Sequence, residues 1–164
     1  SYKNSPSKKG TSRGFAKNYY DLMSIEELKQ IDISSISEDN AVLFMWATFP
    51  MIQEALETIK NWGFRYRTCA FVWVKKNKKS DSNFWGCGYY TRSNVEICLL
   101  ATKGKILERK SHSIHQIIES KVEKHSKKPD IVRDKIIELF GDLPRIELFA
   151  RQQVNGWDCW RDEV

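Results

Sequence analysis

The chain has 164 residues with a formal net charge of +6 at pH 7, and 41% of its residues are hydrophobic. A chain of this length and composition can bury a core of its own, which excludes a disordered segment. No apolar run approaches the roughly 20 residues of a membrane-spanning helix, and no signal peptide opens the sequence. We therefore expect a single cytoplasmic domain over residues 1–164, without membrane contact. The basic excess suits a polyanionic partner without requiring one.

Several kinds of site are excluded by residue spacing. The four cysteines have no C-x-x-C spacing, and Cys69 and Cys98 lie in apolar strand-like runs, so we expect reduced core thiols. The three histidines form no metal-ligand spacing with acids or cysteines, and we predict no metal. The glycine motifs of dinucleotide and phosphate loops and the G-x-S-x-G elbow are also absent from the sequence.

The first half of the chain predicts helices and strands in alternation. Residues 1–18 are polar without periodicity and should form a loop. Ser24 and Glu27 have capping-box spacing and should open a short helix. A buried strand, an amphipathic helix ended by Gly63 and a central strand are then predicted at 41–47, 50–62 and 64–74.

In the next stretch, a loop rich in lysine and then in aromatic residues leads to a strand at 95–102. Residues 105–127 are polar, with a short helix predicted at 114–119. Because no helix joins the strands at 64–74 and 95–102, they can form a local antiparallel pair in a mixed sheet. Alternating strands and helices predict a three-layer α/β fold.

The last stretch reads as helix, turn, strand, loop and strand. Pro129 suits a first helical turn, the helix runs on to Phe140, and Gly141 is a natural C-cap. Residues 145–150 are largely apolar, which predicts a strand covered on both faces. Residues 157–163 predict an adjacent strand that ends in acid.

Glu147 is the odd residue in the strand at 145–150. Ligands bind at the carboxyl ends of strands in open α/β sheets, so Glu147 can be a ligand residue. A structural ion pair with Arg145 or Arg151 explains the same carboxylate equally well. Asp162 and Glu163 leave a similar choice between a ribose contact and a solvated terminus.

The loop at 84–96 combines aromatic residues and glycines with Arg92 and Asn94. Such residues can stack on a base and hydrogen-bond its edge. They can equally be aromatic residues tucked onto the sheet with polar residues capping a turn. A nucleotide-type ligand fits these features, but residue types alone do not name it.

One ordered series of segments runs the whole length of the sequence. It comprises S-Y-K-N at 1–4, AVLFMWAT at 41–48, N-W-G-F at 61–64, F-V-W-V-K at 71–75, G-Y-Y-T-R-S-N-V-E-I-C-L-L-A-T-K-G at 88–104, S-K-K-P-D at 126–130, and R-I-E-L-F-A-R with G-W-D at 145–158. This series strongly resembles the MT-A70 family of adenine-N6 methyltransferases, in particular its phage and bacterial DNA-methylating branch.

The resemblance implies a Rossmann-like, S-adenosylmethionine-dependent methyltransferase fold with a mixed sheet flanked by helices. It also implies methyl transfer to N6 of adenine in DNA. In the family pattern Lys128 pairs with the cofactor's methionine carboxylate. The other cofactor-binding positions implied are Glu147, Leu148, Phe149, Arg151, Gln153, Asp162 and Glu163. The positions implied to contact the nucleic-acid target are Tyr2, Asn4, Tyr90, Arg92, Asn94 and Glu96.

The sequence departs from the family pattern in two places. Arg161, Asp162 and Glu163 stand where the family has Gly-Asn-Gln or Gly-Asn-Glu. The catalytic Asp-Pro-Pro-aromatic signature does not occur, and we expect it upstream of Ser1. A non-catalytic nucleic-acid-binding subunit of the same fold is the alternative, as is an RNA methyltransferase. A homo- or heterodimer is compatible with either.

Overall fold

A mixed four-stranded sheet forms the centre of the computed structural model, which describes residues 23–124 and 126–160. The strand order is β1-β3-β2-β4. Strands β1 (Ala41–Ala47) and β2 (Arg65–Lys76) both pair antiparallel with β3 (Val95–Lys103), whereas β4 (Ile117–Lys121) runs parallel to β2. The antiparallel pair predicted for the strands at 64–74 and 95–102 is therefore confirmed.

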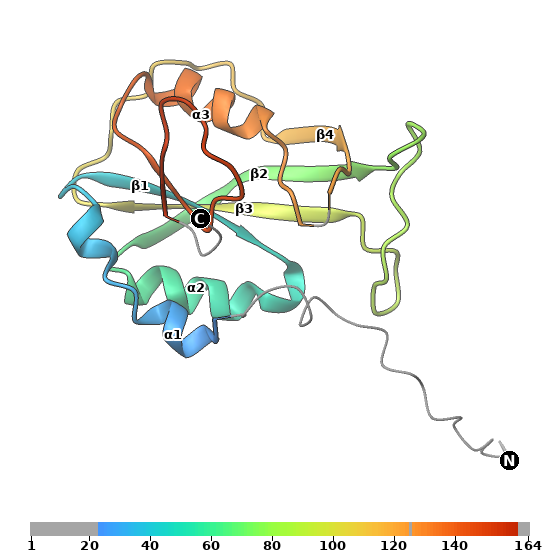
Figure 1. Cartoon of the computed structure of the whole chain (residues 1–164), viewed down its shortest axis with the longest axis horizontal. Coiled ribbons are helices and arrows are strands. Elements are labelled where there is room, and N and C mark those ends of the chain that lie inside the picture. Colours follow the sequence, from blue (N-terminus) through green and yellow to red (C-terminus); the bar gives the residue numbers. More distant parts are fainter. Residues whose placement is uncertain (1–22, 125, 161–164) are drawn as a thin grey trace, which may run out of the picture.

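Helices cover both faces of this sheet (Figure 1). Helices α1 (Ile25–Lys29) and α2 (Ile52–Asn61) lie on one face, and α3 (Ile131–Phe140) lies on the other. Two short 3-10 turns, η2 (Ile33–Ile36) and η3 (Phe49–Met51), precede β1 and α2. The predicted three-layer α/β arrangement is confirmed.

Local signals set the ends of these helices. The Ser24 hydroxyl accepts from the backbone N–H of Glu27, and the Glu27 carboxylate accepts from the backbone N–H of Ser24, which completes the predicted capping box. Gly63 ends the α2 segment with φ of 79°, and Gly141 ends α3 with the same φ. Positive φ is costly for residues with a Cβ, so glycine suits both positions.

Strand β3 joins two hydrophobic cores because its side chains alternate between the faces. Ile97 and Leu99 pack with Ile59 on the side of α2, whereas Cys98 packs with Val132 on the side of α3. Cys98 is fully buried, and burial raises the pKa of its thiol to about 12. The four cysteines are all thiols rather than disulfides.

The prediction of a helix at 114–119 is wrong, because strand β4 begins within this segment, at Ile117. Ile118 is buried in the core on the side of α3, and Ile117 and Ile118 are β-branched residues that suit a pleated strand. One edge of β4 pairs with β2, for example Ile118 with Trp73. Part of the polar 105–127 segment is thus a strand of the sheet.

Strands β5 (Ile146–Leu148) and β6 (Asp158–Trp160) form a separate parallel pair. The predicted adjacency of these two strands is confirmed. The expectation that the first would be covered on both faces is wrong. Ile146 is exposed, and Glu147 and Leu148 are only partly buried. Among the residues that the structure describes, β5 pairs with β6 alone and β1 with β3 alone.

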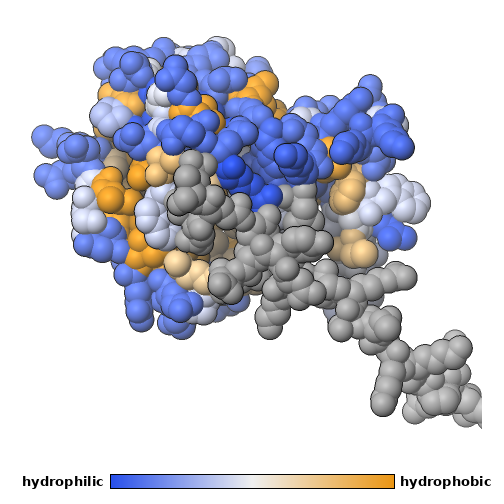
Figure 2. All heavy atoms as spheres, viewed as in Figure 1, coloured by the Kyte–Doolittle hydropathy of each residue, from blue (hydrophilic) through white to orange (hydrophobic). Residues whose placement is uncertain are grey.

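Hydrophilic residues occupy much of the described surface in the view of Figure 2, with hydrophobic residues gathered in patches between them. In the two described ranges, no helix is both long and apolar enough to cross a membrane.

Candidate functional site

The site is built around Glu96, a buried carboxylate on β3. Lys75 donates through Nζ to one oxygen of Glu96, and Lys128 donates through Nζ to the other. These three residues, here called the lysine–glutamate cluster, come from β3, from the carboxyl end of β2 and from the segment before α3. The carboxyl ends of strands are where open α/β sheets bind ligands, so the cluster stands at the expected place.

The cluster brings together two residues that the resemblance assigned to different tasks. Lys128 was predicted to meet the cofactor, and Glu96 was predicted to contact the target. Burial alone would raise the pKa of Glu96, but the hydrogen bonds and charges of Lys128 and Lys75 outweigh burial and lower that pKa. Glu96 is therefore ionised at neutral pH, and the cluster keeps one net positive charge from its two lysines.

Two tryptophan rings lie under the lysines. The Nζ of Lys75 lies 5.1 Å from the ring centroid of Trp73, and that of Lys128 lies 5.8 Å from the ring of Trp46. The two rings meet edge to face at 6.3 Å. An aromatic face attracts a cation within about 6 Å, so the rings help to hold both lysines on the α3 side of the sheet.

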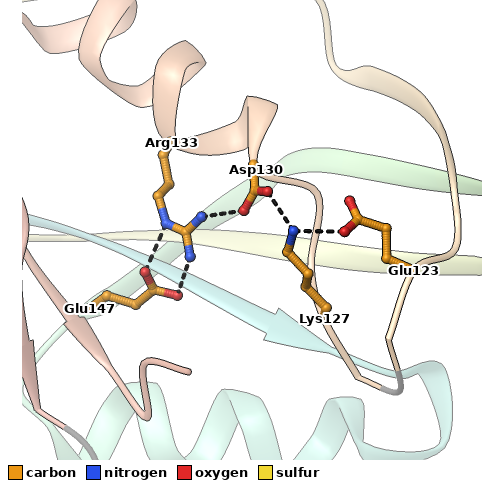
Figure 3. A network of polar contacts seen from close by, with 5 residues as sticks. All are labelled: Glu123, Lys127, Asp130, Arg133 and Glu147. Atoms are coloured by element: carbon orange, nitrogen blue, oxygen red, sulfur yellow. Dashed lines mark hydrogen bonds and ion pairs between the residues drawn. The ribbon is translucent and has the colours of Figure 1, made fainter. Parts of the chain in front are cut away.

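A chain of ion pairs ties α3 to β5 (Figure 3). Arg133 donates to both oxygens of Glu147, at 2.8 and 3.0 Å, and to Asp130 at 2.6 Å. Lys127 then joins Asp130 to Glu123, at 2.6 and 2.7 Å. We call these five residues the ion-pair chain. It fixes β5 against the first turn of α3 and fixes the segment that carries Lys128.

The structural ion pair considered for Glu147 exists, but the predicted partners are wrong. The partner is Arg133, because α3 places this residue beside β5. Arg145 instead donates to Asp142 at 2.9 Å and lies over the ring of Trp157 at 5.6 Å. Burial disfavours the charged form of Arg133, yet Glu147 and Asp130 outweigh burial and raise the pKa of its guanidinium.

The loop between β5 and β6 is held by its own contacts. Phe149 adopts a positive φ of 58° and meets Trp160 edge to face at 5.1 Å. Gln153 donates to the carbonyl of Trp157 at 2.9 Å and accepts from the Cys159 thiol at 2.7 Å. Leu148 packs against the core, and Arg151 lies exposed in the bend after β5. Four predicted cofactor positions are thus gathered around one loop.

A projecting arm, residues 77–94, joins β2 to β3 and extends from the end of the sheet (Figure 1). At its tip Tyr89 and Tyr90 are 95% and 93% exposed and touch edge to face at 4.8 Å. Arg92 lies over the exposed ring of Trp85 at 4.9 Å. The rings of Trp85, Tyr89 and Tyr90 are exposed to solvent, so the alternative that placed the aromatic residues against the sheet is wrong for these three side chains.

A tight turn shapes the tip of the arm. A Cβ on Gly88 would stand 1.9 Å from the carbonyl oxygen of Thr91, so only glycine fits there. At the base, the carbonyl of Asn94 accepts from the backbone N–H of Lys75 at 2.8 Å. The four described target positions therefore extend from Tyr90 at the tip of the arm to Glu96 at the start of β3.

Four predicted positions lie outside the described residues: Tyr2, Asn4, Asp162 and Glu163. Other residues of the site were not singled out from sequence: Lys75, Trp46, Trp73 and Arg133. Lys75 carried a usable signal, since it is the first charged residue after an apolar strand. The described ranges contain no group of three or more histidine, cysteine or acidic side chains placed to hold a metal ion.

The sequence of the chain is similar to known proteins. The MT-A70 family pattern matches residues 4–163. The chain is 38% identical over 146 residues to the Type II methyltransferase M.MunI of a Mycoplasma species, a match that covers 88% of the chain and 60% of that protein. It is 27% identical over 133 residues to the human N(6)-adenosine-methyltransferase catalytic subunit METTL3, covering 80% of the chain and 23% of that protein.

A protein of Drosophila melanogaster named as an MT-A70-like N(6)-adenosine-methyltransferase gives a similar match, 27% over 133 residues, with 22% of its length covered. The chain thus spans about 60% of the Mycoplasma protein and less than a quarter of these two larger relatives. Since the family pattern covers nearly all of the sequence, the chain belongs to the MT-A70 methyltransferase family.

Proposed function

We propose that this chain binds S-adenosylmethionine and contributes to methyl transfer onto N6 of adenine in DNA. The observation that carries the proposal is the lysine–glutamate cluster, a net cation at the carboxyl end of β2 in a chain of this family. The side chain of Lys128 is the more exposed lysine of the cluster and has N–H donors beyond the one given to Glu96. This donor set fits the carboxylate of the cofactor's methionyl part.

The remaining cofactor contacts are proposed on the loop after β5. Leu148 and Phe149 would supply apolar contact, while Arg151 and Gln153 would reach polar groups of the cofactor. Glu147 holds β5 against α3, and its oxygens keep lone pairs for a further donor. Asp162 and Glu163 are proposed to accept from the ribose hydroxyls. When bound, the cofactor supplies a methyl group on a positively charged sulfur, and no metal is needed for its transfer.

The arm is proposed to bind the nucleic acid. Exposed aromatic rings beside an arginine can stack on bases, and such stacking tolerates many sequences. Tyr90 and Arg92 would contact the target strand, with Asn94 and Glu96 nearer to the cofactor; Tyr2 and Asn4 are proposed to approach the same target. A duplex substrate would have to release its adenine from the stack, at a cost of a few kcal/mol.

DNA is favoured over RNA by the 38% identity to a Type II methyltransferase. RNA is the second candidate, because two relatives at 27% identity are named as N(6)-adenosine-methyltransferases. The acid that the family uses to polarise N6 is proposed to precede Ser1. The test of activity therefore uses the chain together with any residues that precede Ser1 in its gene.

The test is methyl transfer from labelled S-adenosylmethionine to duplex DNA, single-stranded DNA and RNA of the same sequence. Calorimetry with S-adenosylmethionine and with S-adenosylhomocysteine is run in parallel in the presence of a chelator. We expect cofactor binding and labelled N6-methyladenine in DNA. Binding without transfer to any of the three would assign the non-catalytic subunit, whereas no binding of either cofactor form would overturn the proposal.

A further inference from the structure

Glu96 has two lysine partners, and each uses a different oxygen of the carboxylate. One cation would be enough to balance the charge of one buried carboxylate. The second lysine therefore calls for an explanation, because burying another ammonium group carries a desolvation cost.

The two lysines are not held equally. The side chain of Lys75 is 18% exposed and that of Lys128 is 32% exposed. Lys75 sits within β2, where its N–H donates to Asn94 and its carbonyl accepts from the N–H of Phe84 at 2.9 Å. Lys128 lies outside regular structure, in the segment before α3. Lys128 is thus the lysine that can exchange its partner.

Lys128 cannot give its ion pair to an incoming carboxylate without a consequence for Glu96. If Lys128 were the sole partner, its loss would leave a buried carboxylate unpaired, which is strongly destabilising. Glu96 would then compete with the ligand for Lys128. With Lys75 in place, Glu96 keeps a charge-assisted hydrogen bond when Lys128 turns away.

We infer that Lys75 is a positioning residue that holds Glu96, so that Lys128 is free to bind the cofactor's carboxylate. This inference rests on the proposed function, since it takes the carboxylate to be that of S-adenosylmethionine. Lys75 acts on Glu96 in the same direction as Lys128, since both lysines lower the pKa of this carboxyl against the burial that raises it.

The experiment compares two ligands that differ in the group concerned. S-adenosylhomocysteine carries the methionyl-type carboxylate, and 5′-methylthioadenosine lacks the whole amino-acid part. Both are titrated by calorimetry into the protein with any residues that precede Ser1, and into the variants Lys75→Met, Lys128→Met and Glu96→Gln and the double variant Lys75→Met/Glu96→Gln. Lys76→Met is the matched control, because the next lysine of β2 pairs with Asn83 and Glu119 instead.

We expect Lys128→Met to weaken S-adenosylhomocysteine binding about ten- to hundredfold, as the loss of one charge-assisted contact implies. Lys75→Met should weaken it by at least about fivefold, although Lys75 does not touch the ligand, because Glu96 then retains Lys128. Neither change should alter the affinity for 5′-methylthioadenosine. The double variant should regain most of the lost affinity, since the amide that replaces the Glu96 carboxylate has no charge with which to hold Lys128.

Three results would overturn the inference: unchanged S-adenosylhomocysteine affinity in Lys75→Met, equal loss of both ligands, or no recovery in the double variant. If Lys75→Met does not fold, the double variant is compared with Glu96→Gln alone, and the inference requires equal affinities. Failure of the unmodified protein to bind either ligand would instead reject the proposed function, so the two failures are distinguishable.

Discussion

The bidentate ion pair between Arg133 and Glu147 gives the sharpest prediction, through the variant Glu147→Gln. Arg133 donates to both oxygens of Glu147, and its side chain is largely buried. The amide keeps one acceptor oxygen but turns an N–H₂ group toward the guanidinium. One charge-assisted hydrogen bond becomes neutral and the second is lost, while Arg133 keeps Asp130 as a partner.

A charge-assisted hydrogen bond contributes about 1.5–3 kcal/mol and a neutral one about 0.5–1.5 kcal/mol. Partial exposure of Glu147 and the remaining contact with Asp130 reduce the difference, so we expect a loss of about 1–2 kcal/mol in the free energy of unfolding. For a domain of this size that corresponds to a melting temperature lower by roughly 2–8 °C.

The assay is thermal melting of Glu147→Gln, Arg133→Gln and the double variant, together with S-adenosylhomocysteine titration of each folded protein. A double-mutant cycle isolates the coupling between the two side chains. Coupling near zero, with unchanged melting temperatures, would refute the structural part of the reasoning. A lower melting temperature with unchanged ligand affinity would support the structural role of the ion pair and would reject Glu147 as a cofactor-binding residue.

Three further predictions concern other parts of the molecule. Because the folded-state pKa of Glu96 is lowered from its ordinary 4.5, its ion pairs stabilise the protein above that pH and stop doing so as pH falls below it. The difference in melting temperature between the unmodified protein and Glu96→Gln should therefore shrink between pH 5 and pH 3; a constant difference would contradict this. Replacing both Tyr89 and Tyr90 with Ala should weaken binding of single-stranded DNA by about fivefold or more without changing the melting temperature. The control Phe49→Ala, at an exposed aromatic residue outside the arm, should leave both the DNA affinity and the melting temperature unchanged. Unchanged DNA affinity would remove the tip of the arm from the nucleic-acid contact. A thiol reagent should label Cys87 rapidly and leave Cys98 unlabelled in the folded protein, because Cys98 is buried with a pKa of about 12; rapid labelling of Cys98, read by mass spectrometry, would refute its burial.

Features set by neighbouring residues were predictable from the sequence. The capping box of Ser24 and Glu27, the glycines that end α2 and α3, and the largely apolar strand β3 all depend on short stretches of chain. Their physical causes act within a few residues, so a local pattern carries the whole signal.

Features that depend on contacts between distant parts of the chain could not be predicted from the sequence. Strand β4 takes its backbone partners from β2, more than 40 residues earlier, and its short sequence, with two isoleucines in a polar stretch, does not indicate which strand it pairs with. The partner of Glu147 depends on how α3 lies against β5. The family resemblance predicted Lys128 and Glu96 as site residues, each for a separate task. Lys75 was not predicted, because only the register of β2 on β3 brings its side chain to Glu96.

That position of Lys75 has a thermodynamic consequence. Its backbone N–H and carbonyl bind Asn94 and Phe84, the two sides of the arm, while its ammonium group binds Glu96. Lys75 thus takes part both in the backbone hydrogen bonds at the base of the arm and in the lysine–glutamate cluster. If nucleic acid on the arm displaces Lys75 by even a little, the affinity of Lys128 for an anion changes with it. Linkage then requires the reverse effect to be equal, so the bound anion alters nucleic-acid affinity by the same factor.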